Sequence, residues 1–393
     1  MASSAESIRA YSGPPVFSFG FRPFFLFSAV WAAIAVPVWV ASMALGDGTV
    51  GAMDGRLWHI HEMLFGYLAG VIAGFLLTAV PNWTGRLPVT GLKLAGLFAL
   101  WAAGRAAGFL PASMGIVGAV IDSAFLVVFA GLIWREVLAA KNARNLPVCL
   151  LVTMLAAANI AFHLRGVIPL FGPGAERGAV AVVTGLIALI GGRVTPSFTR
   201  NWTAARGIAK GPTAFNLFDA AVLALTGVAL VCWVAAPWSP LTGGAMALAG
   251  VSNLARLARW RGWLARPEPL VWILHLGYAW LGAGMILLGL SALVPDAVPF
   301  TAGVHALTTG AMGVETLAIM TRATRGHTGR PRVADRSTIA IYLLILSAAL
   351  VRVSAPFLGE WTVILLAVSA TLWALAFAGF VLSYGPMLWR RSL

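Results

Sequence analysis

The stretch LWHIHEMLFGYLAGVIAGFLLTAV, residues 57–80, decides the fold class of this chain. It is mostly apolar over more than the about 20 residues that a helix needs to cross a hydrocarbon core. It also carries His59, His61 and Glu62 near its start. We therefore predict a membrane-spanning helix with polar groups close to one end.

Other apolar stretches of similar length precede and follow residues 57–80. Of the 393 residues, 60% are hydrophobic and 10% are charged, and the mean hydropathy is +0.88. This composition excludes a soluble globular domain, a disordered chain and a disulfide scaffold. About twelve spans are predicted, at 24–44, 57–80, 92–109, 112–134, 146–165, 178–194, 215–235, 241–255, 270–293, 300–320, 337–353 and 361–383. The fold class is thus an all-α polytopic membrane bundle.

The basic residues predict the orientation, because short cytoplasmic loops retain Lys and Arg. With the N-terminus inside, 22 of the 27 Lys and Arg residues fall in cytoplasmic segments. Both termini are then cytoplasmic, and residues 1–393 form a single membrane domain with an N-terminal segment 1–23 and a tail 384–393. The net charge of +14 is explained by insertion and by attraction to lipid head groups, so nucleic acid is not expected as a partner.

Histidines are the main candidates for function, because ionisable groups at membrane depth are costly unless they are paired or functional. Four of them converge on the outer leaflet: His59 and His61 in the second span, His163 at the end of the fifth, and His305 in the tenth. We interpret this level as a metal or haem site, since imidazole binds iron, copper and zinc. The alternative is that each ring simply bonds to a neighbouring helix.

Two details of this level remain open. His59 and His61 are two residues apart and cannot share one helix face, so they either serve two centres or lie on an unwound turn. Glu62 is a candidate acceptor that orients one of them. Asp122, near the end of the fourth span, is a candidate to neutralise Arg105.

A second polar group is predicted at inner depth, formed by His275, Glu315 and Asp219. It is interpreted either as a proton path, as a second ligand set, or as a hydrogen-bonded structural cluster. His275 is also the substitute ligand if one of the outer histidines fails.

A haem would present propionates, and arginines on the outer side are the natural partners of these groups. Arg56, Arg105 and Arg165 are the candidates, although an arginine near a span end can also simply extend to the interface. There is no CxxCH motif, so any haem is non-covalent. Cys149 and Cys232 lie at different depths, and we expect no disulfide between them.

Two spacings in the sequence predict how the helices pack and whether they repeat. Gly66, Gly70 and Gly74 share one face of the second span, which predicts close helix packing. His61 and His305 are each followed 23 residues later by Thr-Gly-Arg, which suggests three four-helix units in which spans two, six and ten are equivalent.

Several long motifs then carry a family resemblance. They are Gly20-Phe21-Arg22-Pro23-Phe24-Phe25, the blocks at 58–66 and 73–85, Gly191-Gly192-Arg193-Val194-Thr195-Pro196 through Trp202, His305-Ala306-Leu307-Thr308, and Met320-Thr321-Arg322-Ala323-Thr324-Arg325-Gly326-His327. With these motifs the chain resembles the NnrS family from the first span to the last.

This resemblance implies a bacterial inner-membrane protein that contains haem b and copper and responds to nitric oxide, with links to nitrosative stress and denitrification. The helix plan is also similar to the core of the haem-copper oxidases, but the chain lacks their His-Pro-Glu-x-Tyr stretch. Reductase chemistry is therefore left open. The implied partners are nitric oxide or a related small molecule, membrane lipid and an electron donor of unknown identity.

For the ligands we predict His61 and His305 on haem and His59 with His163 on copper. Two other functions compete with this one. A secondary transporter also has about twelve spans with both ends inside. A protein that delivers haem or metal to another complex would release its cofactor rather than retain it.

Overall fold

The structure is a computed structural model that describes residues 11–46, 48–51, 53–168 and 171–392. In these ranges the chain is almost entirely helical. The sheet found there is an antiparallel hairpin of β1 (Thr49–Val50) and β2 (Met53–Asp54), with Thr49 opposite Asp54. The all-α class is therefore confirmed.

The chain forms two compact units. Unit 1 comprises Met1–Ala179, Ala323–Pro331 and Phe377–Leu393, and unit 2 comprises Val180–Arg322 and Arg332–Ala376. The single membrane domain over the whole chain stays a prediction.

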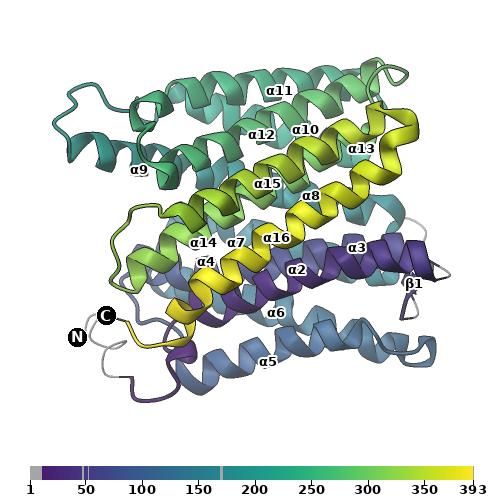
Figure 1. Ribbon diagram of the computed structural model, residues 1–393, viewed down its shortest axis with the longest axis horizontal. Coiled ribbons are helices and arrows are strands. Elements are labelled where there is room, and N and C mark those ends of the chain that lie inside the picture. Colours follow the sequence, from purple (N-terminus) through teal and green to yellow (C-terminus); the bar gives the residue numbers. More distant parts are fainter. Residues whose placement is uncertain (1–10, 47, 52, 169–170, 393) are drawn as a thin grey trace. The chain divides into compact units, whose positions relative to one another are not determined.

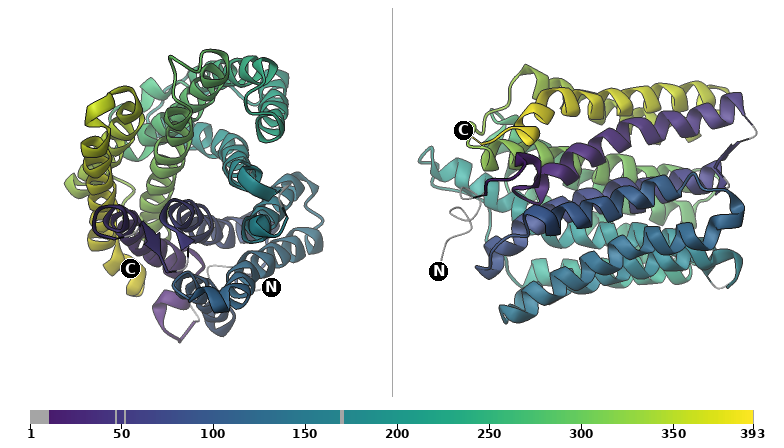
Figure 2. Two further views of the ribbon diagram at one scale, coloured as in Figure 1. Left: turned by 90° about the vertical axis from the view of Figure 1, so that its right-hand side faces the viewer. Right: turned by 90° about the horizontal axis from the view of Figure 1, so that it is seen from below.

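Unit 1 holds the first five long helices. They are α2 (Phe21–Leu45), the helix made of α3 (Gly55–His61), a π-helical segment (Glu62–Leu68) and α4 (Ala69–Thr84), then α5 (Gly91–Ala107), α6 (Gly115–Ala139) and α7 (Leu146–His163). Helix α5 packs on α6, and α6 packs on α7 and α4. These helices run along a common direction, seen lengthwise in the right-hand view of Figure 2.

Unit 2 holds most of the remaining helices, and three helices cross the boundary between the units. Those within unit 2 are α9 (Gly192–Ala204), α10 (Leu217–Ala235), α11 (Pro240–Ala258), α12 (Pro269–Leu293), α13 (Phe300–His305) and α15 (Arg336–Ser354). The three that cross are α8 (Gly172–Leu186), α14 (Gly313–His327) and α16 (Thr362–Trp389). Helices α11 and α12 lie side by side (Figure 1).

Each predicted span coincides with a helix, but the described residues contain nine helices that are long and apolar enough to cross a membrane. Helix α5, helix α11 and the continuous helix of α13 and α14 fall outside this set. The sixth predicted span, 178–194, is part of a longer helix, Gly172–Ala204. The chain is a multi-pass membrane protein, and the count of twelve spans stays a prediction.

The glycine stripe of the second span packs against α2 as predicted. A Cβ placed on Gly74 would lie 2.8 Å from a ring carbon of Phe25, and one placed on Gly70 would collide with the hydroxyl of Ser28. Close approach of α2 and α4 therefore requires glycine at these positions.

Three helices contain a π-helical segment, in which each N–H bonds to the fifth carbonyl before it. Among the described residues these segments are Glu62–Leu68, Ile187–Gly191 and Ala306–Met312. The first begins directly after His61 and the third directly after His305. The three helices are those predicted to be equivalent in the repeat, while the repeat itself stays a prediction.

Candidate metal centre

Helix α3 positions His59 and His61 at the start of the second span. Asp54 caps this helix, because its side chain accepts a hydrogen bond from the Leu57 N–H at 3.1 Å. The backbone is regular α-helix up to His61, so the turn is not unwound. The two rings point to different surroundings: His59 stacks on Trp39 with 4.0 Å between ring centroids, whereas His61 is buried among polar groups.

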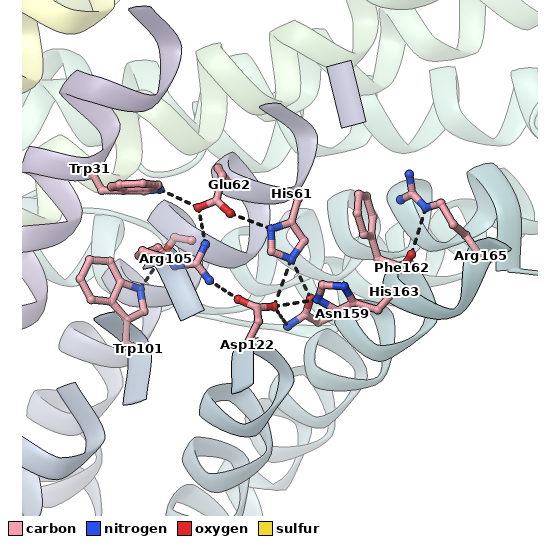
Figure 3. A network of polar contacts seen from close by, with 11 residues as sticks. Trp31, His61, Glu62, Trp101, Arg105, Asp122, Asn159, Phe162, His163 and Arg165 are labelled. Carbon is pink, nitrogen blue, oxygen red and sulfur yellow. Dashed lines mark hydrogen bonds and ion pairs between the residues drawn. The ribbon is translucent and has the colours of Figure 1, made fainter. Parts of the chain in front are cut away.

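His61 contacts acceptors through both ring nitrogens (Figure 3). Its Nδ1 lies 2.9 Å from Glu62 Oε1, and its Nε2 lies 3.0 Å from Asp122 Oδ2 and 3.2 Å from Asn159 Oδ1. His163, at the end of α7, reaches the same Asp122 oxygen with Nε2 at 3.0 Å. Asp122 on α6 thus joins two histidines that are 102 positions apart in sequence.

Arg105 on α5 lies between the two carboxylates. Its guanidinium donates to Glu62 Oε2 and to Asp122 Oδ1, and all three side chains are buried. The predicted pairing of Asp122 with Arg105 is therefore confirmed. Trp31 also donates to Glu62 Oε2, at 2.8 Å, so the carboxylate of Glu62 is held from three sides.

The charge of this cluster is unbalanced without one more cation. Glu62 and Asp122 supply two negative charges and Arg105 supplies one positive charge. A net negative charge is costly at membrane depth, so either a protonated imidazole or a metal ion must balance it. Because both nitrogens of His61 face oxygen acceptors, this arrangement suits a doubly protonated ring in the absence of metal.

The ligand atoms fit a transition-metal ion. One atom each from His61, Asp122 and His163 lie within 4.8 Å of one another, and this is the only such group of His, Cys, Asp and Glu in the described part of the chain. Two imidazole nitrogens and one carboxylate oxygen suit copper, zinc or iron. Glu62 would accept from Nδ1 of His61, the usual second partner of a metal-bound imidazole.

The three candidate arginines have separate roles. Arg105 belongs to the buried cluster, whereas the side chain of Arg56 is 67% exposed and lies 3.7 Å from Glu176. Arg165 lies 3.4 Å from the same Glu176 and stacks its guanidinium over the ring of Phe162. A propionate-binding role for these arginines stays a prediction.

The other predicted ligands lie in unit 2. The Nδ1 atom of His305 is 2.8 Å from the backbone oxygen of Thr301, one turn earlier in α13. The Nε2 atom of His275 is 2.8 Å from the hydroxyl of Thr199 on α9. Each of these two rings thus has a hydrogen-bond partner within its own unit.

The predicted inner group of His275, Asp219 and Glu315 is divided among different contacts. Asp219 pairs with Arg256 at 3.0 Å, and Arg256 also donates to the hydroxyl of Tyr278. The described residues show no shared ligand position for the three side chains. This arrangement favours separate roles over a second ligand set.

Sequence reasoning missed the place of two residues in the candidate metal centre, Asp122 as a possible ligand and Asn159 as a neighbour of His61. Asp122 was expected only as the partner of Arg105, and Asn159 was not singled out. A signal was nevertheless present, because Asn159 lies four residues before His163 on the same helix and therefore on the same face. Polar residues at helical spacing from a membrane histidine would have revealed it.

Comparison with known families gives a match over nearly the whole chain. Residues 15–392 match the family model described as NnrS protein. No curated protein matches the chain.

Proposed function

The chain belongs to the NnrS protein family, and from this premise we propose that it is a copper- and haem-binding membrane protein of the nitric oxide response. Family membership itself indicates a membrane protein related to that response. The proposal adds the cofactors, the residues that hold them and the bacterial inner membrane as the location.

One observation carries the copper site: the ligand atoms of His61, Asp122 and His163 converge within 4.8 Å inside a buried cluster that lacks one positive charge. These three side chains would hold the ion, and the proton on Nε2 of His61 would be displaced by it. Glu62 would keep the proton at Nδ1 and so fix the tautomer of that ring. Arg105 would hold both carboxylates in place.

His305 is the proposed haem ligand. Its Nδ1 atom lies 2.8 Å from the Thr301 carbonyl, and an N–H donated there would fix the tautomer in which Nε2 is the ligand atom for iron. When bound, haem supplies an iron that binds nitric oxide, and copper supplies one-electron redox chemistry. This proposal assigns His61 to copper, and it leaves His59 and His275 outside both sites.

The division into two units is the one observation that favours the rival function, a secondary transporter. Transporters usually bind substrate near the interface of two repeats. The cluster around Asp122 belongs to unit 1 alone, which supports a metal centre instead.

The proposed partners are nitric oxide or a related small molecule, lipid and an electron donor, without nucleic acid. A proposed cytoplasmic location of both termini is supported by Arg22 at the start of α2. Its guanidinium donates to the carbonyls of Leu388 at 3.0 Å and of Arg390 at 2.6 Å, at the end of α16. The start of the first long helix and the end of the last one thus lie together, as an even number of spans requires.

The test is cofactor analysis of purified variants in detergent. We expect His163→Ala to lose copper and keep the Soret band, and His305→Ala to lose the band and keep copper. His59→Ala is the matched control, because His59 lies on the same helix as His61 but outside both proposed sites. This variant should keep both cofactors. Copper retained by His163→Ala at the wild-type ratio would reject the copper site.

The role in the nitric oxide response needs a separate measurement. A strain that lacks this protein should grow poorly with a nitric oxide donor, and the wild-type chain should restore growth. Restoration to the same extent by His163→Ala, with its copper absent, would show that the copper site does not serve this response.

A further inference from the structure

Glu315 is a buried acid that the proposed metal and haem sites do not use. It lies on α14, three residues after the end of the π-helical segment Ala306–Met312. Its side chain is 6% exposed, and its Oε1 atom is buried without a hydrogen-bond partner among the described residues. A polar atom in this state is rare in folded proteins and calls for a functional or structural reason.

Helix α12 makes room for this carboxyl group. A Cβ placed on Gly277 would lie 2.8 Å from Cγ of Glu315 and 3.0 Å from both its Cδ and its Oε1. The side chain of Glu315 is therefore packed tightly against the backbone of α12. Glycine at position 277 is required for this packing, because any larger residue would displace the carboxyl group.

The charged groups around Glu315 form no ion pair with it among the described residues. No Lys, Arg or His of the described chain lies within 4.0 Å of its carboxyl oxygens. On α12 the neighbouring hydroxyl of Tyr278 donates to Asn253 at 2.7 Å, and His275 is bonded to Thr199. The cation of α11 closest to Tyr278 is Arg256, which is paired with Asp219.

The remaining groups are on α14 and α15. Arg322, two turns further along α14, holds its guanidinium over the ring of Phe198 at 4.0 Å. Tyr342 of α15 bonds to the hydroxyl of Thr321 at 2.6 Å. None of these groups supplies a positive charge to Glu315, so an ionised carboxylate there would be buried and unpaired.

We propose that Glu315 is a proton-binding site inside the membrane, which holds its proton at neutral pH and exchanges it with water. A buried carboxylate without a counter-charge is far less stable than the neutral acid. Acids of this kind are the usual members of proton relays in membrane proteins. The inference does not depend on the copper site, which consists of residues of unit 1.

The position of Glu315 on its helix fits this role. His305 lies ten residues before it and Arg322 seven residues after it on the helix Phe300–His327, so about 15 Å and about 10 Å separate them along the axis. Arg322 and Arg325 belong to the end predicted to be cytoplasmic. Glu315 could therefore take up a proton from the cytoplasm.

Infrared spectroscopy of the full chain in lipid nanodiscs tests the proposal. At neutral pH we expect a carbonyl stretch of a protonated carboxylic acid, lost in Glu315→Gln and retained in the control Glu360→Gln, which removes an exposed acid. Since the chain has 13 Asp and Glu residues, single variants can assign the band. A band that is absent from the wild type, or unchanged in Glu315→Gln, would overturn the proposal.

Two further measurements keep the proposal falsifiable. Transfer to heavy water should lower the frequency of the band if the proton exchanges, whereas an unshifted band would reject exchange. Gly277→Ala retains the acid and displaces it, so the band should persist at a changed frequency even if Glu315→Gln fails to fold. An unchanged band in Gly277→Ala would assign the proton to another residue.

Discussion

At the scale of single residues, Asp122 is the side chain that contacts both Arg105 and the two candidate ligand histidines, His61 and His163. Its Oδ1 atom accepts from Arg105, and its Oδ2 atom contacts His61, His163 and Asn159. A carboxylate can accept from several donors at once, and no neutral side chain of this size offers the same number of acceptor sites. The geometry of both imidazoles therefore depends on this residue.

Replacement of Asp122 by asparagine should weaken the proposed copper site. The amide keeps the size but turns one oxygen into a donor that faces Arg105 or the histidines, which are donors themselves. Loss of a residue that only supports a metal ligand lowers metal affinity about 10–100-fold. We expect the copper affinity of this variant to fall by at least as much. Titration of the metal-free protein with copper would measure it.

The matched control for this variant is Asp296→Asn, because Asp296 is an exposed acid far along the chain from the cluster. It should bind copper as the wild type does. Equal affinities for both variants would remove Asp122 from the ligand set.

Arg105 is expected to be the most sensitive residue for stability. Arg105→Met leaves Glu62 and Asp122 buried without their shared cation, and removal of one member of a buried ion pair costs about 3–5 kcal/mol. The free energy of unfolding, measured in mixed micelles with denaturant, should fall by this amount. Arg56→Met is the control, since the exposed pair with Glu176 should contribute only about 0–1 kcal/mol.

A second variant separates charge from packing. Addition of Glu62→Gln to Arg105→Met removes one of the uncompensated charges, so part of the lost stability should return. If the double variant is as unstable as the sum of both changes, the effect of Arg105 comes from packing and not from charge.

At the scale of elements, side chains from other helices donate hydrogen bonds to backbone carbonyls of two π-helical segments, Glu62–Leu68 and Ile187–Gly191. Trp101 of α5 donates to the carbonyl of Gly66 at 2.9 Å, and Arg256 of α11 donates to the carbonyl of Ala188 at 3.0 Å. Helices α5 and α11 are both outside the nine that meet the membrane criterion. Each of these two helices supplies a polar side chain that bonds to a π-helical segment.

The segments Glu62–Leu68 and Ala306–Met312 are separated by the same 244 residues as His61 and His305. Such segments often occur at functional sites, because the extra residue in the turn changes the direction of the side chains around it. This spacing supports the predicted equivalence of spans two and ten. The segment Ile187–Gly191 lies elsewhere in its helix, because it ends five residues before Pro196, whereas Glu62–Leu68 ends 13 residues before Pro81.

Deletion of one residue should convert a π-helical segment into α-helix. Deletion of Met63 would remove the extra residue that sets the direction of the side chains around the segment, His61 among them. We expect this variant to lose copper and to keep the Soret band. Both cofactors can be measured on the same purified sample.

The corresponding deletion in the other segment is the matched control. Removal of Thr309 from Ala306–Met312 should affect His305 and the Soret band but leave copper in place. Loss of both cofactors in both deletions would indicate general unfolding instead of a local change.

At the scale of the whole molecule, hydropathy predicted the helices but not their internal geometry. The length of an apolar stretch can be read from the local sequence alone. For this reason each of the twelve predicted ranges coincides with a helix. A π-helical segment depends on donors such as Trp101 and Arg256, which come from other helices and are invisible to a local pattern. The extension of the sixth range to Gly172–Ala204 was missed because its ends are less apolar than its centre.

The candidate site was partly predictable for the same reason. The cost of ionisable groups in a membrane drew attention to His61, His163 and Arg105. The pairing of ligands could not be read from depth alone, since His59 and His61 are at one level and face different neighbours. Side-chain direction on each helix decides which residues meet.

The number of spans can be tested through the two ends of the chain. Because Arg22 binds the carbonyls at the end of α16, both ends should lie on one side of the membrane, which requires an even number of spans. Single cysteines at the exposed positions Ser12 and Arg391, with Cys149 and Cys232 replaced by serine, should react with an impermeant maleimide only after spheroplasts are lysed. A cysteine at Asp296 should react in intact spheroplasts, because its loop is predicted to be periplasmic. Labelling of positions 12 and 391 from opposite sides would instead require an odd number, such as the nine helices that meet the length and hydropathy criterion in the described chain.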